Sequence, residues 1–144
     1  MRRIGQRSER GGVVNSKRVL ILDDDGAQGA RLKDCFARFN HGCTYEVIAA
    51  TSTSETLAAL RKGRPDLIIL EPEMVKFDAL SMVTKLGKHE NGIPLIAVSK
   101  GTKRATTEAI FGLGLLAYMP KPVDLASFEH IVAMAWQSAA YPST

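Results

Sequence analysis

The sequence lacks the residue patterns that hold structural metal ions. It contains only two cysteines, Cys35 and Cys43, which form no CxxC pair and have no pair of histidines beside them. Zinc-binding modules depend on such spacing, so this class of site is excluded. Cys35 falls on the apolar side of a predicted helix, which indicates a buried, reduced thiol, while Cys43 falls in a predicted loop. Neither cysteine is assigned a role.

Long apolar runs are also missing. No stretch of the sequence approaches the roughly 18 apolar residues that a membrane-spanning helix needs. Residues 1–10 carry positive charge, but no apolar segment follows them, so they do not have the pattern of a secretory signal. We therefore expect a cytoplasmic protein that contacts no membrane.

The sequence indicates no broad basic surface. The net charge is +4, and most of it comes from residues 1–16, where several arginines stand against a single glutamate. This segment contains glycine and serine and has no periodicity, which predicts a disordered tail; weak contact with nucleic acid or an acidic partner is the alternative. Residues 17–144 are nearly neutral and have no basic stripe, which argues against a dedicated DNA-binding module.

Strand and helix patterns alternate from residue 17 onward. The composition, 45% hydrophobic and 24% charged, suits one globular domain over residues 17–144, and no internal repeat is present. Ser52 and Glu55 form a capping-box pattern at the start of the second helix. The predicted strands span residues 18–22, 45–49, 66–70, 93–98 and 116–119. The predicted helices span residues 27–39, 52–62, 78–88 and 102–112, and a last helix begins at residue 124.

These strand–helix units, with continuous apolar strands, predict a parallel sheet with helices on both faces. Right-handed crossovers leave few arrangements of such units. The commonest is the flavodoxin-like (βα)5 fold of the α/β class, a doubly wound parallel sheet with strand order 2-1-3-4-5. Ligands bind this fold at the carboxyl ends of the strands, in the crevice beside strands one and three.

Four of the predicted strands end in polar residues. Asp23 and Asp24 follow the first strand, Glu71 follows the third, Ser99 follows the fourth and Lys121 follows the fifth. Because the carboxyl ends of parallel strands share one edge, we expect these side chains to meet. Carboxylates that face one another need a cation nearby. Acids, a hydroxyl and a lysine around one point indicate a phosphate-handling pocket, with Mg²⁺ on the carboxylates and phosphoryl oxygens on the amine and hydroxyl.

In these features the chain resembles the receiver domains of bacterial two-component response regulators, over essentially residues 17–140. The stretch 71–79 aligns with the phosphoacceptor loop of that family. The other matches are the acidic pair that binds metal, the switch hydroxyl, the aromatic switch residue and the lysine–proline pair, which correspond here to Asp23-Asp24, Ser99, Tyr118 and Lys121-Pro122.

The resemblance implies a signalling module of two-component or phosphorelay transduction that acts by protein–protein contact and is not an enzyme. It implies Mg²⁺ on Asp23 and Asp24, with Glu71 and the backbone of Glu73 as further ligands. The partners would be a histidine kinase, a phosphotransferase or a downstream regulator, bound through the face formed by residues 102–112, 116–119 and the last helix. Since the sequence ends at residue 144, soon after that helix, we expect a stand-alone receiver.

The phosphoacceptor position departs from the family pattern. The family has an aspartate there, and this sequence has Glu71; Val75 and Ala79 also replace the usual proline and glycine of the loop. The glutamate carboxylate lies one methylene further out, and in-line phosphoryl transfer is sensitive to misplacement of about 1 Å. We therefore expect phosphorylation to be impaired. Either Glu71 accepts hydrogen bonds from Lys121 and Ser99 and imitates the phosphorylated form, or it neutralises Lys121 and the protein never switches.

Two other functions compete with this interpretation. Asp23, Asp24, Asp25 and Gly26 also fit the DxDG motif of haloacid-dehalogenase-like phosphatases, with Asp23 and Asp25 as the reacting acids. That family needs a further acidic pair after the lysine and a substrate-selecting cap, and the sequence has neither. The other alternative is a pseudo-receiver scaffold that binds a partner without a metal.

Several further residues have ordinary structural explanations. Asp25 and Asp78 are expected to cap helices, since each directly precedes a helical pattern. Trp136 lies on a broad apolar stripe of the last helix and is expected to be buried. The histidines are expected at the surface; they are His41, His89 and His130.

Overall fold

The computed structural model describes residues 15–74, 76–89, 93–101, 113 and 115–140. Almost all of the predicted tail, residues 1–16, lies outside these ranges. So do Val75 and the helix predicted over residues 102–112, for which the label α4 is kept.

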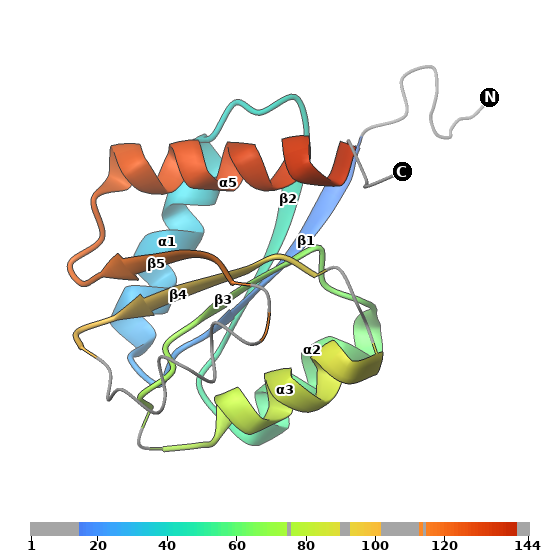
Figure 1. The fold of residues 1–144 in the computed structure, drawn as a ribbon, viewed down its shortest axis with the longest axis vertical. Coiled ribbons are helices and arrows are strands. Elements are labelled where there is room, and N and C mark those ends of the chain that lie inside the picture. The colour runs from blue at the N-terminus through green and yellow to red at the C-terminus, as the bar shows by residue number, and fades with distance from the viewer. Residues whose placement is uncertain (1–14, 75, 90–92, 102–112, 114, 141–144) are drawn as a thin grey trace.

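A parallel sheet forms the centre of the domain, with strand order β2-β1-β3-β4-β5 (Figure 1). The predicted flavodoxin-like order 2-1-3-4-5 is thereby confirmed. Each pair of neighbouring strands is parallel. The strands are β1 (Ser16–Leu22), β2 (Thr44–Ala50), β3 (Leu67–Leu70), β4 (Leu95–Ser99) and β5 (Leu115–Pro120).

Helices cover both faces of the sheet, as the apolar strands predicted (Figure 1). α1 and α5 pack on one face, and α2 and α3 pack on the other. The helices are α1 (Gly26–Arg38), α2 (Thr53–Lys62), α3 (Ala79–His89) and α5 (Leu125–Ala140).

The two cores follow from the two-residue period of the strands. In β1, Val19 and Ile21 join the core under α1 and α5, where Phe128 is fully buried. Leu20 and Leu22, which alternate with them, join the core under α2 and α3. The buried parts of the strands, such as residues 19–22 of β1 and all of β3, therefore carry apolar residues at successive positions, which explains the uninterrupted apolar runs.

Asp25 and Asp78 each cap a helix, as the sequence indicated. The Asp25 carboxylate accepts hydrogen bonds from the backbone N–H groups of Ala27 and Gln28, at 3.0 and 3.3 Å. Asp78 accepts from the N–H of Ser81 at 3.0 Å. These caps satisfy N–H groups that the first helical turn leaves free, and they start each helix just after the loop that leaves the sheet.

The predicted capping box of α2 is formed only in part. The Ser52 hydroxyl accepts from the N–H of Glu55 at 3.2 Å, as expected. The Glu55 carboxylate, however, accepts from the N–H of Thr51 at 2.7 Å and not from that of Ser52. It also accepts from the Thr51 hydroxyl, and these bonds lower the pKa of Glu55.

The amino-terminal edge of the sheet holds a polar and aromatic cluster that corrects one expectation. His41 was expected at the surface, but only 8% of its side chain is exposed. Its ring stacks on Phe39, and its Nδ1 lies 2.6 Å from the Tyr45 hydroxyl. The indole N–H of Trp136 donates to the same hydroxyl at 2.7 Å. This cluster joins α5 to β2 at the end of the molecule opposite the predicted site. His130 is exposed, as expected.

None of the described helices is long and apolar enough to cross a membrane.

Candidate functional site

The register of the sheet brings the first two acids side by side. Leu22 and Leu70, the last residues of β1 and β3, are register partners, so Asp23 and Glu71 follow at the same height. The N–H of Glu71 donates to the carbonyl of Leu22 at 2.9 Å, which extends the ladder one residue beyond the strands. Lys121 is held in the same way beyond β5, because its N–H donates to the Ser99 carbonyl at 2.9 Å. The sheet itself therefore positions these residues.

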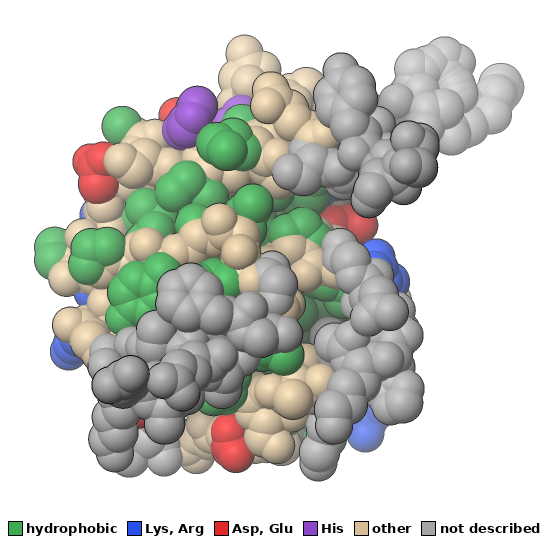
Figure 2. All heavy atoms as spheres, viewed as in Figure 1, with side chains coloured by type: hydrophobic (Ala, Val, Ile, Leu, Met, Phe, Trp, Pro, Cys, Tyr) green, Lys and Arg blue, Asp and Glu red, His purple; other side chains and the backbone are tan. Residues whose placement is uncertain are grey.

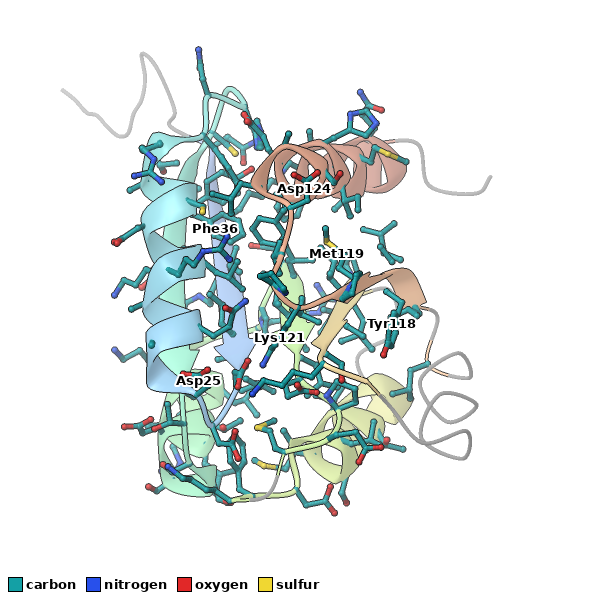
Figure 3. All side chains as sticks on the ribbon, turned by 90° about the vertical axis from the view of Figure 1, so that its left-hand side faces the viewer. Asp25, Phe36, Tyr118, Met119, Lys121 and Asp124 are labelled. Carbon is teal, nitrogen blue, oxygen red and sulfur yellow. The ribbon has the colours of Figure 1, made fainter. Side chains whose placement is uncertain are left out.

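The ammonium of Lys121 joins both carboxylates. Its Nζ lies 2.7 Å from Oδ2 of Asp23 and 3.2 Å from Oε1 of Glu71. The three side chains are nearly buried: the exposed fraction is 9% for Lys121, 5% for Asp23 and 8% for Glu71. Figure 3 shows Lys121 at the same edge of the sheet as Asp25. We name this set of Asp23, Glu71 and Lys121 the acid–lysine cluster.

The remaining carboxylate oxygens of the cluster also have donors. Oδ1 of Asp23 accepts from the N–H of Asp25 at 2.9 Å, and Oε2 of Glu71 accepts from the N–H of Glu73 at 3.1 Å. Each of the four oxygens thus accepts at least one hydrogen bond from the protein. Asp24 lies beside the cluster, half-buried, and its Oδ2 accepts from the N–H of Lys76 at 3.1 Å.

Burial and charge act in opposite directions in the cluster. Burial alone would lower the pKa of Lys121, but hydrogen bonds and charge from Asp23 and Glu71 outweigh it and raise that pKa. For Asp23, burial is the largest influence and raises the pKa, although the hydrogen bond from Lys121 opposes it. Two carboxylates share one ammonium, so the charged form of the lysine is strongly favoured. For Asp23, the contact with Lys121 offsets only part of the effect of burial on the pKa.

The two predicted switch residues lie apart from this cluster. Ser99 is buried, and its hydroxyl donates to the Gly101 carbonyl at 3.2 Å and accepts from the Gly101 N–H at 3.1 Å. The expected hydrogen bond from Ser99 to Glu71 is therefore not formed, which corrects that prediction. Tyr118 is 36% exposed, and Figure 3 shows it directed away from Lys121.

Strand periodicity explains this separation. In β5, Met119 belongs to the core under α1 and α5, so Lys121, two residues later, continues that face. In β4, Ala97 belongs to the opposite core, so Ser99 continues the opposite face. Tyr118 pairs with Ala97 and lies on that opposite face too. The acid–lysine cluster and the switch residues therefore belong to different faces of one sheet.

The residue types at this edge suit Mg²⁺, but their arrangement does not. Carboxylate oxygens are the ligands that Mg²⁺ prefers, in a nearly ideal octahedron. Here the oxygens of Asp23 and Glu71 accept from the protein, and Lys121 occupies the position between the two acids. Within the described ranges, no group of three or more histidine, cysteine, aspartate or glutamate residues is placed to hold a metal ion. As it stands, the cluster fits an ammonium group.

The two aspartates of the DxDG motif, which suggested the phosphatase alternative, have structural roles in this protein. The second aspartate, Asp25, is exposed and caps α1 through the bonds described above. The first aspartate, Asp23, is paired with Lys121. The structure therefore gives the motif a structural explanation and offers no support for a phosphatase centre.

One contact near the site was not predicted. Nη2 of Arg31, in α1, donates to the carbonyl of Val123 at 3.0 Å and so ties α1 to the loop between β5 and α5. Lys121 begins this loop, so Arg31 restrains the segment that carries the ammonium. Arg31 and Val123 are 92 positions apart, and no sequence motif links them.

Comparison with known proteins identifies the family. Residues 19–133 match the model of the response regulator receiver domain. The transcriptional regulatory protein PrrA of Mycobacterium tuberculosis is 32% identical over 118 residues, which cover 78% of this chain and 47% of PrrA. The DNA-binding transcriptional regulator NtrC of Azospirillum brasilense is 26% identical and covers 90% of this chain and 26% of NtrC. The chain thus spans about half the length, or less, of these curated relatives.

Solved structures share the fold. A CheY-like receiver domain protein from Methanospirillum hungatei has a TM-score of 0.73 at 22% identity and covers 89% of this chain and 100% of its own. The receiver domain of an HD domain-containing protein from Pseudomonas fluorescens has a TM-score of 0.75 at 15% identity. The match covers 89% of this chain and 100% of that domain. Receiver domains as a family are signalling modules and typically bind Mg²⁺ at this edge. The chain belongs to the response regulator receiver domain family of two-component signalling.

Proposed function

We propose that this receiver domain signals by protein–protein contact and that Glu71 does not accept a phosphoryl group. The observation that carries the proposal is the buried contact between Glu71 and Lys121, at 3.2 Å, in the position where the family has its phosphoacceptor aspartate. The proposal concerns this domain, because the relatives named above extend well beyond it.

The geometry supports impaired transfer for two reasons. A nucleophilic carboxylate oxygen must approach the phosphorus in line, and Glu71 carries its oxygens one methylene further from the backbone than an aspartate would. Both oxygens of Glu71 are also occupied, one by Lys121 and the other by the N–H of Glu73. With about 7% of the residue exposed, a donor has little access to either oxygen.

The contacts favour neutralisation of Lys121 over imitation of a phosphorylated state. A phosphoryl group would offer acceptor oxygens to both the lysine and the switch hydroxyl. Glu71 reaches the lysine, but Ser99 bonds within its own loop and Tyr118 is directed outward. The carboxylate of Glu71 contacts Lys121 and the N–H of Glu73, while the Ser99 hydroxyl bonds to Gly101. This supports a receiver that holds one conformation and works as a binding scaffold.

The proposed partners are a histidine kinase, a phosphotransferase or a downstream regulator. Figure 2 shows hydrophobic side chains gathered on the face between α5 and β5. Tyr118 of β5 and Leu125 and Met134 of α5 are each more than a third exposed. Apolar side chains on an edge strand and an adjacent helix support protein docking there. The polar, basic helix α4 predicted for the same face lies outside the described residues.

The test is phosphorylation by acetyl phosphate in the presence of Mg²⁺, followed by intact-protein mass spectrometry. The native protein is expected to gain no phosphoryl group, whereas Glu71→Asp should gain one, because it restores the acceptor of the family. Glu71→Gln is the matched control, since it keeps the side-chain length and removes the nucleophile. A stoichiometric adduct on the native protein that Glu71→Gln abolishes would overturn the proposal.

A further inference from the structure

We infer that Lys121 is the resident cation of this pocket and takes the place of the divalent metal, so that the acidic edge is closed by the protein itself and does not bind Mg²⁺. The inference rests on the proposed function in one respect, namely that the acid–lysine cluster occupies the phosphoacceptor site of the family. It adds a statement about regulation, namely that Mg²⁺ does not control the state of this site.

The hydrogen bonds of the acidic edge are the first argument. Each oxygen of Asp23 and Glu71 accepts from Lys121 or from a backbone N–H, at distances from 2.7 to 3.2 Å. Asp24, the remaining acid of the expected metal site, accepts from the N–H of Lys76. A metal ion would have to break several of these bonds before it gained its own ligands.

The position of the ammonium is the second argument. Lys121 lies within hydrogen-bond reach of both Asp23 and Glu71, where a bridging cation would have to sit. Two cations in one nearly buried pocket repel each other strongly, because little water screens them. Mg²⁺ also loses its own water reluctantly and usually retains several water molecules when it binds a protein. The pocket therefore admits Mg²⁺ only if Lys121 leaves.

The glutamate explains why the lysine is held so firmly. Its longer side chain allows Oε1 to contact Lys121 while Oε2 returns to the N–H of Glu73, two residues later. Asp23 is held similarly, between Lys121 and the N–H of Asp25. The ammonium thus joins two carboxylates that are each anchored to their own loop.

The experiment uses Mn²⁺ as a paramagnetic probe for Mg²⁺ sites. Its binding to the full chain is measured through the broadening of the backbone amide NMR signals of residues 23–25 and of Glu71 and Glu73. The native protein is expected to show no saturable broadening. Lys121→Met should bind Mn²⁺ at least about tenfold more tightly, and added Mg²⁺ should compete. Lys33→Met, which removes an exposed lysine of α1, is the matched control and should behave like the native protein.

Saturable Mn²⁺ binding by the native protein, as tight as in Lys121→Met, would overturn the inference. So would a folded Lys121→Met that binds no more Mn²⁺ than the native protein. A second measurement needs no variant: about 10 mM Mg²⁺ should leave the midpoint of thermal unfolding of the native protein unchanged, since a ligand that does not bind cannot stabilise. A clear rise would contradict the inference. Both readouts are independent of phosphorylation, so this inference and the proposed function can fail separately.

Discussion

At residue 71, one additional methylene changes what the carboxylate can do. An aspartate would hold its oxygens one methylene nearer the backbone, and in-line attack is sensitive to a misplacement of about 1 Å. Glu71 spans the distance to Lys121 at 3.2 Å and also binds the N–H of Glu73. Glu71 is thereby part of a buried ion pair, which supports the proposal that it does not accept a phosphoryl group. Because Asp23 shares the same lysine, the three side chains depend on one another.

Lys121→Met should destabilise the protein near neutral pH. The substitution keeps much of the side-chain volume but leaves Asp23 and Glu71 buried without a cation. Breaking a buried pair in this way costs about 3 kcal/mol, near the low end of the usual range because Lys121 retains some contact with solvent. Urea unfolding of the two proteins measures the difference. Lys33→Met, at an exposed site, should change the free energy of unfolding by less than about 0.5 kcal/mol.

The difference between the native protein and Lys121→Met should also depend on pH. The pKa of Lys121 is raised above its ordinary value of 10.5 in the folded protein. Its contribution is therefore fully present below pH 10.5 and disappears as the pH rises through the higher pKa of the folded state. Unfolding of both proteins between neutral pH and strongly alkaline pH checks this. A difference that stays constant across that range would show that packing, and not charge, stabilises the site.

At the scale of the elements, the loop between β5 and α5 carries the cation of the site. It begins with Lys121, and Arg31 of α1 binds its Val123 carbonyl at 3.0 Å. The buried cluster therefore depends on how α1 and this loop are held together. Arg31 acts on the cluster through the Val123 carbonyl and is therefore a positioning residue.

Arg31→Met should loosen this loop without unfolding the sheet. Loss of the hydrogen bond frees the Val123 carbonyl, so the backbone N–H of Lys121 should exchange with solvent several times faster. Hydrogen–deuterium exchange of the backbone amides of Lys121, Val123 and Asp124 measures the effect, and the amides of β1 should keep their protection. Arg38→Met, at an exposed position in the last turn of α1, is the control. Equal exchange in the two variants would mean that Arg31 has no positioning role.

Helix and strand positions were largely predictable because they depend on local pattern. Apolar runs predicted the strands, and Asp25 and Asp78 were identified as caps from their place before helical patterns. The capping box failed in part because the Glu55 carboxylate accepts from the N–H and hydroxyl of Thr51 instead. His41 was misplaced because its burial depends on Phe39 and Tyr45 and on the approach of α5, which brings Trp136 from 91 positions beyond Tyr45.

At the scale of the whole molecule, topology decides which predicted site residues meet. The strand order and the polar residues at the strand ends were predictable, and they place Asp23, Glu71 and Lys121 at one edge. The sequence did not show that Ser99 and Tyr118 would lie apart from them. That separation could have been found by counting the two-residue period back into β4 and β5, since Lys121 and Ser99 then fall on opposite faces. The loop bonds of Ser99 and the tether of Arg31 depend on three-dimensional packing and had no signal in the sequence.

The central claim is that Glu71 and Lys121 form one stabilising unit, and a double-mutant cycle tests it most directly. The free energy of unfolding would be measured for the native protein, Glu71→Gln, Lys121→Met and the double variant, all near neutral pH. A coupling energy of about 1 kcal/mol or more is predicted, because Lys121→Met leaves two buried carboxylates without a cation when Glu71 is present, but only that of Asp23 when residue 71 is glutamine. Additivity within roughly 0.3–0.5 kcal/mol would show that the two residues act independently and would contradict the account.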